Sequence, residues 1–288
     1  MKGWLIKKMS EKFKLPTIEY DNAIFNQRKE NIDNLLENLD SNDLKTKVEN
    51  FAKRYGISVE VVENKIRDDS LFALQFSKDP AKQSIHQKIA ASFIKNLPLV
   101  SSFEVLPQSG KNAYYIFNGV ITKGENIRNT KKGKSIDFKW DYTFRNRKLQ
   151  FYATHKYTEL TGGAQDNQFD DVGQFLSNAR DLIDNNVFLF SITDGGHYLG
   201  RETKISNRVI SKINYLNQQY KGSRNYSTTS NYLLRDMGNE IIEWLNRNFS
   251  PEEITSEISR IKQIVDHYPK YEFDNELLET INKTKDDH

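Results

Sequence analysis

Hydrophobic and polar positions follow two different periods along the chain. In residues 1–75, apolar side chains recur three and four positions apart, as in the stripe formed by Ile32, Leu35, Leu36 and Leu39. This spacing is typical of amphipathic helices, and no strand pattern interrupts it. The chain therefore begins with a predicted N-terminal helical segment, residues 1–75.

The middle of the chain shows strict alternation of polar and apolar residues. Charged and hydroxyl side chains alternate with large apolar ones over residues 135–144, and a similar alternation covers residues 149–157. The polar residues 145–148 between them are suited to a chain reversal. Two alternating segments joined by a short polar turn predict a β-hairpin with one buried face.

The register of this hairpin decides which polar side chains meet. With a two-residue loop at Asn146-Arg147, Arg145 faces Lys148 and Asp137 faces Lys156. Opposed Cβ atoms lie about 4.5–5.5 Å apart, so a carboxylate and an ammonium would share one face. A slip by one residue would move Lys156 to the other face and turn the aromatic residues toward solvent, which the buried face opposes.

The remaining pattern predicts helices and short strands on both sides of the hairpin. Helices are expected at 80–96, from Phe169 to near Asp184, and at 206–220, 231–248 and 251–267; strands are expected at 103–106, 113–121 and 187–192. The basic, hydroxyl-rich residues 221–230 are interpreted as a linker or a contact to a nucleic-acid backbone. The predicted segments are then 1–75, 76–205 and a C-terminal helical segment, 206–288.

Composition limits the chemistry that the chain can carry. The sequence has no cysteine, and its five histidines show no ligand spacing, so any metal must be held by oxygen. There is no run of about 18 apolar residues and no signal-peptide core, so we expect a cytoplasmic protein without a membrane partner. The net charge of +3 permits a polyanionic partner without requiring one.

Two further segments are candidates for contact with nucleic acid. The loop before the hairpin contains Lys131, Lys132 and Lys134, which are interpreted either as a phosphate clamp or as a solvated loop. Residues 44–67 have the spacing of a helix-turn-helix, with Ala52 as the small residue, Gly56 in the turn, and Ile57 and Val62 as core residues. The second helix, however, carries several acidic side chains. A plain helical hairpin is the alternative interpretation of that unit.

The hairpin offers the groups needed for phosphodiester hydrolysis. This reaction requires an in-line water, positive charge near the phosphate oxygens and an acid for the leaving group, which hard cations and a lysine can supply. Asp137 and Lys156 meet this requirement. No phosphate-binding glycine loop or serine nucleophile motif competes with that interpretation.

The hairpin resembles the PD-(D/E)xK nuclease superfamily, in which an aspartate opens one strand, an acid-x-lysine triplet lies on the next and a helix follows. The matching residues are Ile136-Asp137, Thr154-His155-Lys156 and the helix from Phe169. The 19-residue interval between Asp137 and Lys156 is similar to that of type II restriction endonucleases. The segment FLFSITDGGHY resembles their next strand and recognition-side loop, so the resemblance covers about residues 80–200.

The resemblance implies an α/β fold of the restriction-endonuclease type, with a mixed central sheet, flanking helices and helical extensions at both ends. It implies that Asp137 binds Mg2+ directly, that the main-chain carbonyl of His155 completes the coordination and that Lys156 orients or deprotonates water. Thr154 departs from the family pattern, because a neutral hydroxyl stands where an acid is usual. Asp141 is a possible second carboxylate, acting through water, and an inactive hairpin is the alternative.

The expected substrate is double-stranded DNA. The loops after the two strands would carry the base-reading groups, which are Gln165, Asn167, Gln168 and Arg201. Cleavage of both strands implies a homodimer, and a restriction function implies a cognate DNA methyltransferase as the genetic partner. The alternatives are a repair or structure-specific nuclease and a non-catalytic DNA-binding protein that uses residues 44–67.

Overall fold

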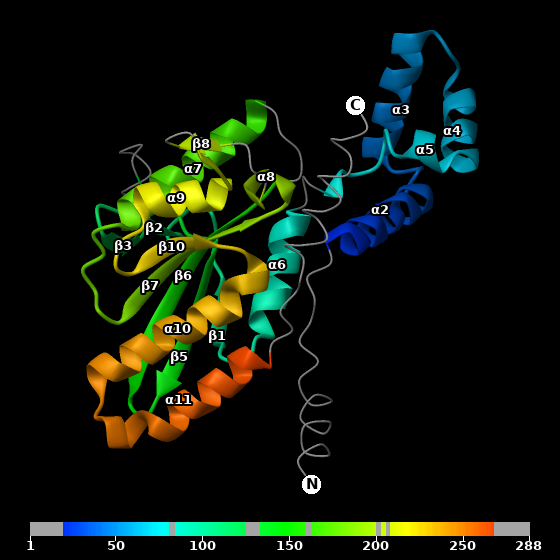
Figure 1. The fold of residues 1–288 in the computed structure, drawn as a ribbon. Coiled ribbons are helices and arrows are strands. Elements are labelled where there is room, and N and C mark those ends of the chain that lie inside the picture. Colours follow the sequence, from blue (N-terminus) through cyan, green and yellow to red (C-terminus); the bar gives the residue numbers. More distant parts are fainter. Residues whose placement is uncertain are drawn as a thin grey trace, which may run out of the picture. The chain divides into compact units, whose positions relative to one another are not determined.

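The computed structural model describes residues 20–80, 84–124, 133–158, 163–199, 203–205 and 208–267 (Figure 1). This part of the chain divides into two compact units, one that ends at Ile89 and one that begins at Ala90. Within the same residues, no helix combines the length and the apolar character needed to cross a membrane.

The first unit is a small helical assembly, as the apolar stripes predict. Its helices are α2 (Tyr20–Glu37), α3 (Asn42–Tyr55), α4 (Val59–Asp68) and α5 (Ser70–Ala73). Gly56 ends α3 with a φ of 66°, and the Ser58 side chain caps α4 by accepting a hydrogen bond from the Val61 amide. Ile57 is 41% exposed, although the helix-turn-helix interpretation places it in the core.

The second unit contains a central sheet with helices on both faces. Its helices are α6 (Ile85–Lys95), which begins just before the unit boundary, α7 (Gly163–Ala179), α8 (Gly196–Leu199), α9 (Lys212–Tyr220), α10 (Ser230–Asn248) and α11 (Pro251–Asp266). Its strands are β1 (Ser101–Val105), β2 (Tyr114–Phe117), β3 (Val120–Lys123), β4 (Lys134–Ser135), β5 (Phe138–Phe144), β6 (Arg147–Tyr157), β7 (Val187–Asp194), β8 (Thr203–Ile205), β9 (Arg208–Ile210) and β10 (Asn225–Thr228).

The central sheet is mixed and has the strand order β1-β5-β6-β7-β10. Strand β5 runs antiparallel to both β1 and β6, whereas β7 runs parallel to both β6 and β10. Helix α7 makes the crossover between β6 and β7, because parallel neighbours cannot be joined by a short turn. The expected α/β class with a mixed central sheet is therefore confirmed.

Each face of the sheet has its own hydrophobic core, which follows from the alternation of side chains along the strands. Phe138, Trp140, Phe151 and Phe190 pack on one face with residues of α6, α10 and α11. Residues of α7 and α9 pack on the other face with Tyr152 and Leu189 of the sheet. In Figure 1, α7 and α9 accordingly lie on the opposite side of the strands from α10 and α11.

The C-terminal region differs from the predicted helical appendage. Residues 225–228 form β10, which pairs with β7 at the edge of the central sheet, so the segment expected to be a linker contains a strand. Helices α10 and α11 contribute to the core on the same sheet. The described residues from Ala90 to His267 therefore belong to one compact unit.

A second difference lies before the central hairpin. The sequence predicts that strands at 103–106 and 113–121 pair with each other, but β1 pairs with β5, and β2 pairs with β3 around Asn118-Gly119. Both turn residues have positive φ, 47° and 75°, which suits the tight turn of a two-residue hairpin. A three-stranded sheet of order β3-β2-β4 results.

Candidate active site

Asp137 lies where the chain leaves the small sheet and enters the central sheet. The Ile136 amide still donates to the Tyr114 carbonyl of β2, whereas the Asp137 amide donates to the Ala153 carbonyl of β6 at 2.8 Å. The Asp137 carbonyl accepts a bond from the Leu106 amide, also at 2.8 Å. Main-chain bonds to both sides hold this residue, and it is 6% exposed.

The register of the hairpin corrects the predicted pairing by two residues. Phe144 pairs with Arg147 and Phe138 pairs with Ala153, so the loop is Arg145-Asn146 and Arg145 has a φ of 51°. A two-residue shift keeps every side chain on its face, which is why the apolar pattern is satisfied by either register. Continued by one residue, the observed register places Asp137 opposite Thr154 instead of Lys156.

The Asp137 carboxylate contacts β6 directly. Its Oδ2 atom accepts a hydrogen bond from Thr154 Oγ1 at 3.0 Å and another from the His155 amide at 2.8 Å. The neutral residue at the position where the family pattern has an acid is therefore in contact with the aspartate. The two donors fix the orientation of the carboxylate just before the start of β5.

Lys156 lies on the same face of β6 as Thr154, two residues farther along the strand. Its Nζ atom is 3.9 Å from Asp171 Oδ2, and Lys134 Nζ of β4 is 2.8 Å from Asp171 Oδ1. Asp171 belongs to α7, so three elements bring one carboxylate and two ammonium groups together. Lys134, predicted to contact DNA, thus has a carboxylate partner within the protein.

Asp171 is not among the site residues predicted from the sequence, although its position on α7 could have indicated it. It lies four residues before Phe175 and one before Val172, on the edge of the stripe that α7 buries against the sheet. A carboxylate on that edge points toward the sheet surface. Asp141, the predicted second carboxylate, instead lies 3.2 Å from Lys148 Nζ and 3.4 Å from the Gln150 amide nitrogen.

The donor set fits a hard cation with oxygen ligands. No group of three or more His, Asp or Glu side chains that could hold a metal occurs among the described residues. Mg2+, however, keeps several waters and needs only one or two carboxylates from the protein. Asp137 could supply one such carboxylate, with Thr154 Oγ1 and the His155 carbonyl as neutral oxygens.

The direction of the His155 carbonyl follows from the hydrogen bonds of β6. The amides of Gln150 and Thr158 donate toward β7, to Asn186 and Asp194. Amide and carbonyl of one strand residue point the same way and alternate along the strand. The His155 amide points to Asp137, so its carbonyl faces the same side.

The predicted DNA-binding residues have different outcomes. Lys131, Lys132 and Arg201 lie outside the described residues, as does the side chain of Gln165. Asn167 is exposed on α7. Gln168 Oε1 accepts a bond from Thr158 Oγ1 at 2.7 Å, which ties the start of α7 to the end of β6.

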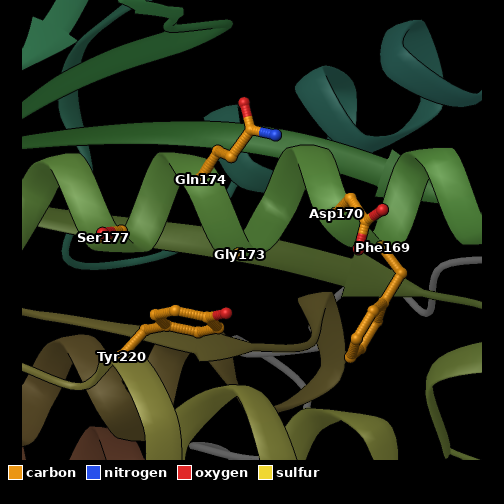
Figure 2. A pocket seen from close by; sticks show the side chains of 6 residues that line it. All are labelled: Phe169, Asp170, Gly173, Gln174, Ser177 and Tyr220. Atoms are coloured by element: carbon orange, nitrogen blue, oxygen red, sulfur yellow. The ribbon is translucent and has the colours of Figure 1, made fainter. Parts of the chain in front are cut away.

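A separate groove of about 250 Å3 lies beside α7. It is lined by Phe169, Asp170, Gly173, Gln174, Ser177 and Tyr220. Figure 2 shows the rings of Phe169 and Tyr220 on one side of α7, while Gln174 points to the other side. A Cβ atom on Gly173 would lie 3.2 Å from the Tyr220 ring, so the missing side chain permits this close approach. The groove contains none of the candidate catalytic side chains.

The turn after β7 closes the end of the site. Gly195 has a φ of 96°, and a Cβ atom there would lie 2.2 Å from the Thr158 carbonyl oxygen. The Thr158 amide donates to the Asp194 carbonyl, and the His197 amide donates to the Thr158 carbonyl. These bonds join the carboxyl ends of β6 and β7.

No protein-family model, curated protein or solved structure matches the chain.

Proposed function

We propose that this chain is a Mg2+-dependent nuclease that hydrolyses phosphodiester bonds in double-stranded DNA, as a type II restriction endonuclease does. The observation that carries the proposal is the contact between Asp137 and Thr154 at the open end of the β5–β6 hairpin, with Lys156 on the same face of β6. Asp137 Oδ2 lies 3.0 Å from Thr154 Oγ1, and Lys156 follows on the same face.

The order of elements supports the same proposal. Helix α6 and strand β1 precede the hairpin, helix α7 follows it, and β7 then pairs parallel to β6. An aspartate before the first hairpin strand, a lysine on the second, a following helix and a next strand are the features on which the resemblance depends. The restriction-endonuclease-like fold is proposed on this basis.

Each polar residue would have a defined part in hydrolysis. Mg2+, when bound, supplies positive charge near the phosphate oxygens and makes water more acidic. The carboxylates of Asp137 and Asp171 would hold the cation with the neutral oxygens of Thr154 and His155. Lys156 would donate hydrogen bonds from Nζ to the attacking water and the phosphate.

The contact between Lys156 and Asp171 contributes to this arrangement. The 3.9 Å separation lets the carboxylate hold the ammonium near the sheet without a tight, immobile pair. In this proposal Asp171 would also supply the negative charge that Thr154 lacks. A cation would then meet two carboxylates although the strand position itself is neutral.

Digestion of a mapped plasmid tests the proposal. With Mg2+ the wild-type protein should give discrete fragments, and excess EDTA should abolish cleavage. Restoring Mg2+ after chelation should restore the same fragments. A purified, folded protein that cuts equally well in EDTA, with removal of metal verified, would refute the assignment of the site.

A further inference from the structure

A buried polar network lies on the opposite face of the sheet from Lys156. His155 of β6, Asp194 of β7 and Ser230 of α10 form it, and they are 8%, 6% and 0% exposed. His155 alternates with Thr154 and Lys156, so its ring points away from the face that carries them. Three separate elements thus contribute one polar side chain each.

Asp194 is the centre of the network. Its Oδ2 atom lies 3.2 Å from His155 Nε2 and accepts a bond from Ser230 Oγ at 2.6 Å. Its Oδ1 atom accepts a bond from the Ser230 amide at 2.9 Å. Ser230 is the first residue of α10, where a carboxylate is also favoured by the helix dipole.

The network reaches the candidate active site through one residue. The His155 ring contacts Asp194, while the His155 amide donates to Asp137 Oδ2 at 2.8 Å. A shift of the strand backbone at His155 would therefore move the amide that orients Asp137. It would also move Thr154 and Lys156, the two neighbours in the strand.

The far end of the network is a rigid support. Helix α10 contributes Leu233, Leu234 and Met237 to the core, and each is 0% exposed. Buried polar groups without partners are costly, so a complete network at a strand end restricts the strand to one arrangement. Anchoring by α10 can therefore hold the end of β6 in place.

We propose that His155, Asp194 and Ser230 are positioning residues that hold the carboxyl end of β6 in register with Asp137. This inference rests on the proposed nuclease function, because the groups being positioned are the proposed catalytic ones. It adds that the geometry of the site is set from α10, on the opposite side of the sheet.

The primary variant is Asp194→Asn, and Asp236→Asn is its matched control. Asp236 is also a buried carboxylate near the start of α10, 8% exposed, but it bonds to Thr228 and Arg235 instead of His155. Ser230→Ala is a milder variant, since the Ser230 amide still reaches Asp194. It keeps the test available if Asp194→Asn does not fold.

Two measurements on the folded variants test the inference. Hydrogen exchange of the His155 amide should become about tenfold faster or more in Asp194→Asn, because its bond to Asp137 is weakened. Mg2+ affinity and kcat should each fall about 10- to 100-fold, with KM for DNA unchanged. Ser230→Ala should show smaller effects in the same direction, and Asp236→Asn should resemble the wild type.

The outcomes separate this inference from the nuclease proposal. Unchanged His155 exchange in folded Asp194→Asn and Ser230→Ala would overturn the positioning role, whatever the nuclease result. A second outcome combines two results: the wild-type protein neither binds Mg2+ nor cuts DNA, but His155 exchange is faster in Asp194→Asn. That outcome would overturn the nuclease proposal and support the structural link. Equal effects in Asp236→Asn would also overturn the inference, because general destabilisation would then explain them.

Discussion

Replacing Lys156 by Ala tests the proposed chemistry most directly, because the same strand carries a matched control, Lys148. Both lysines lie on one face of β6, and each is near one carboxylate from another element. Lys156 Nζ lies 3.9 Å from Asp171, and Lys148 Nζ lies 3.2 Å from Asp141. Only Lys156 adjoins the residues that contact Asp137.

The expected magnitudes differ between stability and catalysis. The two lysine side chains are 33% and 57% exposed, and ion pairs of this kind contribute about 0–1 kcal/mol. Both variants should therefore unfold close to the wild type. If Lys156 donates hydrogen bonds to the attacking water and the phosphate, its loss should slow cleavage by about 10²–10³. That factor corresponds to about 3–4 kcal/mol of transition-state stabilisation.

Single-turnover cleavage of plasmid DNA, with enzyme in excess and saturating Mg2+, measures this step without product release. Each variant should first give coincident unfolding curves by circular dichroism and fluorescence, which shows that it is folded. Lys156→Ala should then be strongly impaired and Lys148→Ala nearly unaffected. Wild-type rates for Lys156→Ala would refute the reasoning, and so would equal losses in both variants.

Three further predictions concern other parts of the unit. Asp171→Asn should lower Mg2+ affinity about tenfold or more in calorimetric titration, and unchanged affinity would exclude Asp171 as a ligand. Gly195→Ala should lower the free energy of unfolding by at least about 1–3 kcal/mol in urea, since its Cβ would lie 2.2 Å from the Thr158 carbonyl oxygen. Burial is the main cause that raises the pKa of Glu240 from 4.5 to about 7, and the negative charge of nearby Glu243 is the second cause. The folded state then holds the proton that the unfolded state releases, so stability should fall as pH rises from about 4.5 through 7, and Glu240→Gln should flatten this slope in pH-dependent unfolding.

The sequence by itself determined the helical character of the first unit and the two faces of the central hairpin. Alternation over residues 138–144 and 149–157 predicted which side chains are buried, and Trp140 and Phe151 are both 0% exposed. This succeeds because the period of two is a property of each strand alone. Asp137, Thr154 and Lys156 could be selected for the same reason.

The pairing between strands was harder to predict from the sequence. Registers that differ by two residues bury the same apolar side chains, so the turn decides between them. Arg145 adopts a φ of 51°, which places the loop one residue earlier than predicted. The pairing of β2 with β3 likewise depended on the Asn118-Gly119 turn, which lies inside the single strand predicted at 113–121.

Contacts between distant elements were decided only by the tertiary structure. The position of Asp171 beside Lys156 depends on how α7 packs across the sheet, and β10 joins the sheet because β7 leaves an edge to pair with. The link from His155 through Asp194 to Ser230 joins three elements that are far apart in the chain. Periodicity encodes which face of an element is buried, but the partner of that face is chosen by the packing of the whole core.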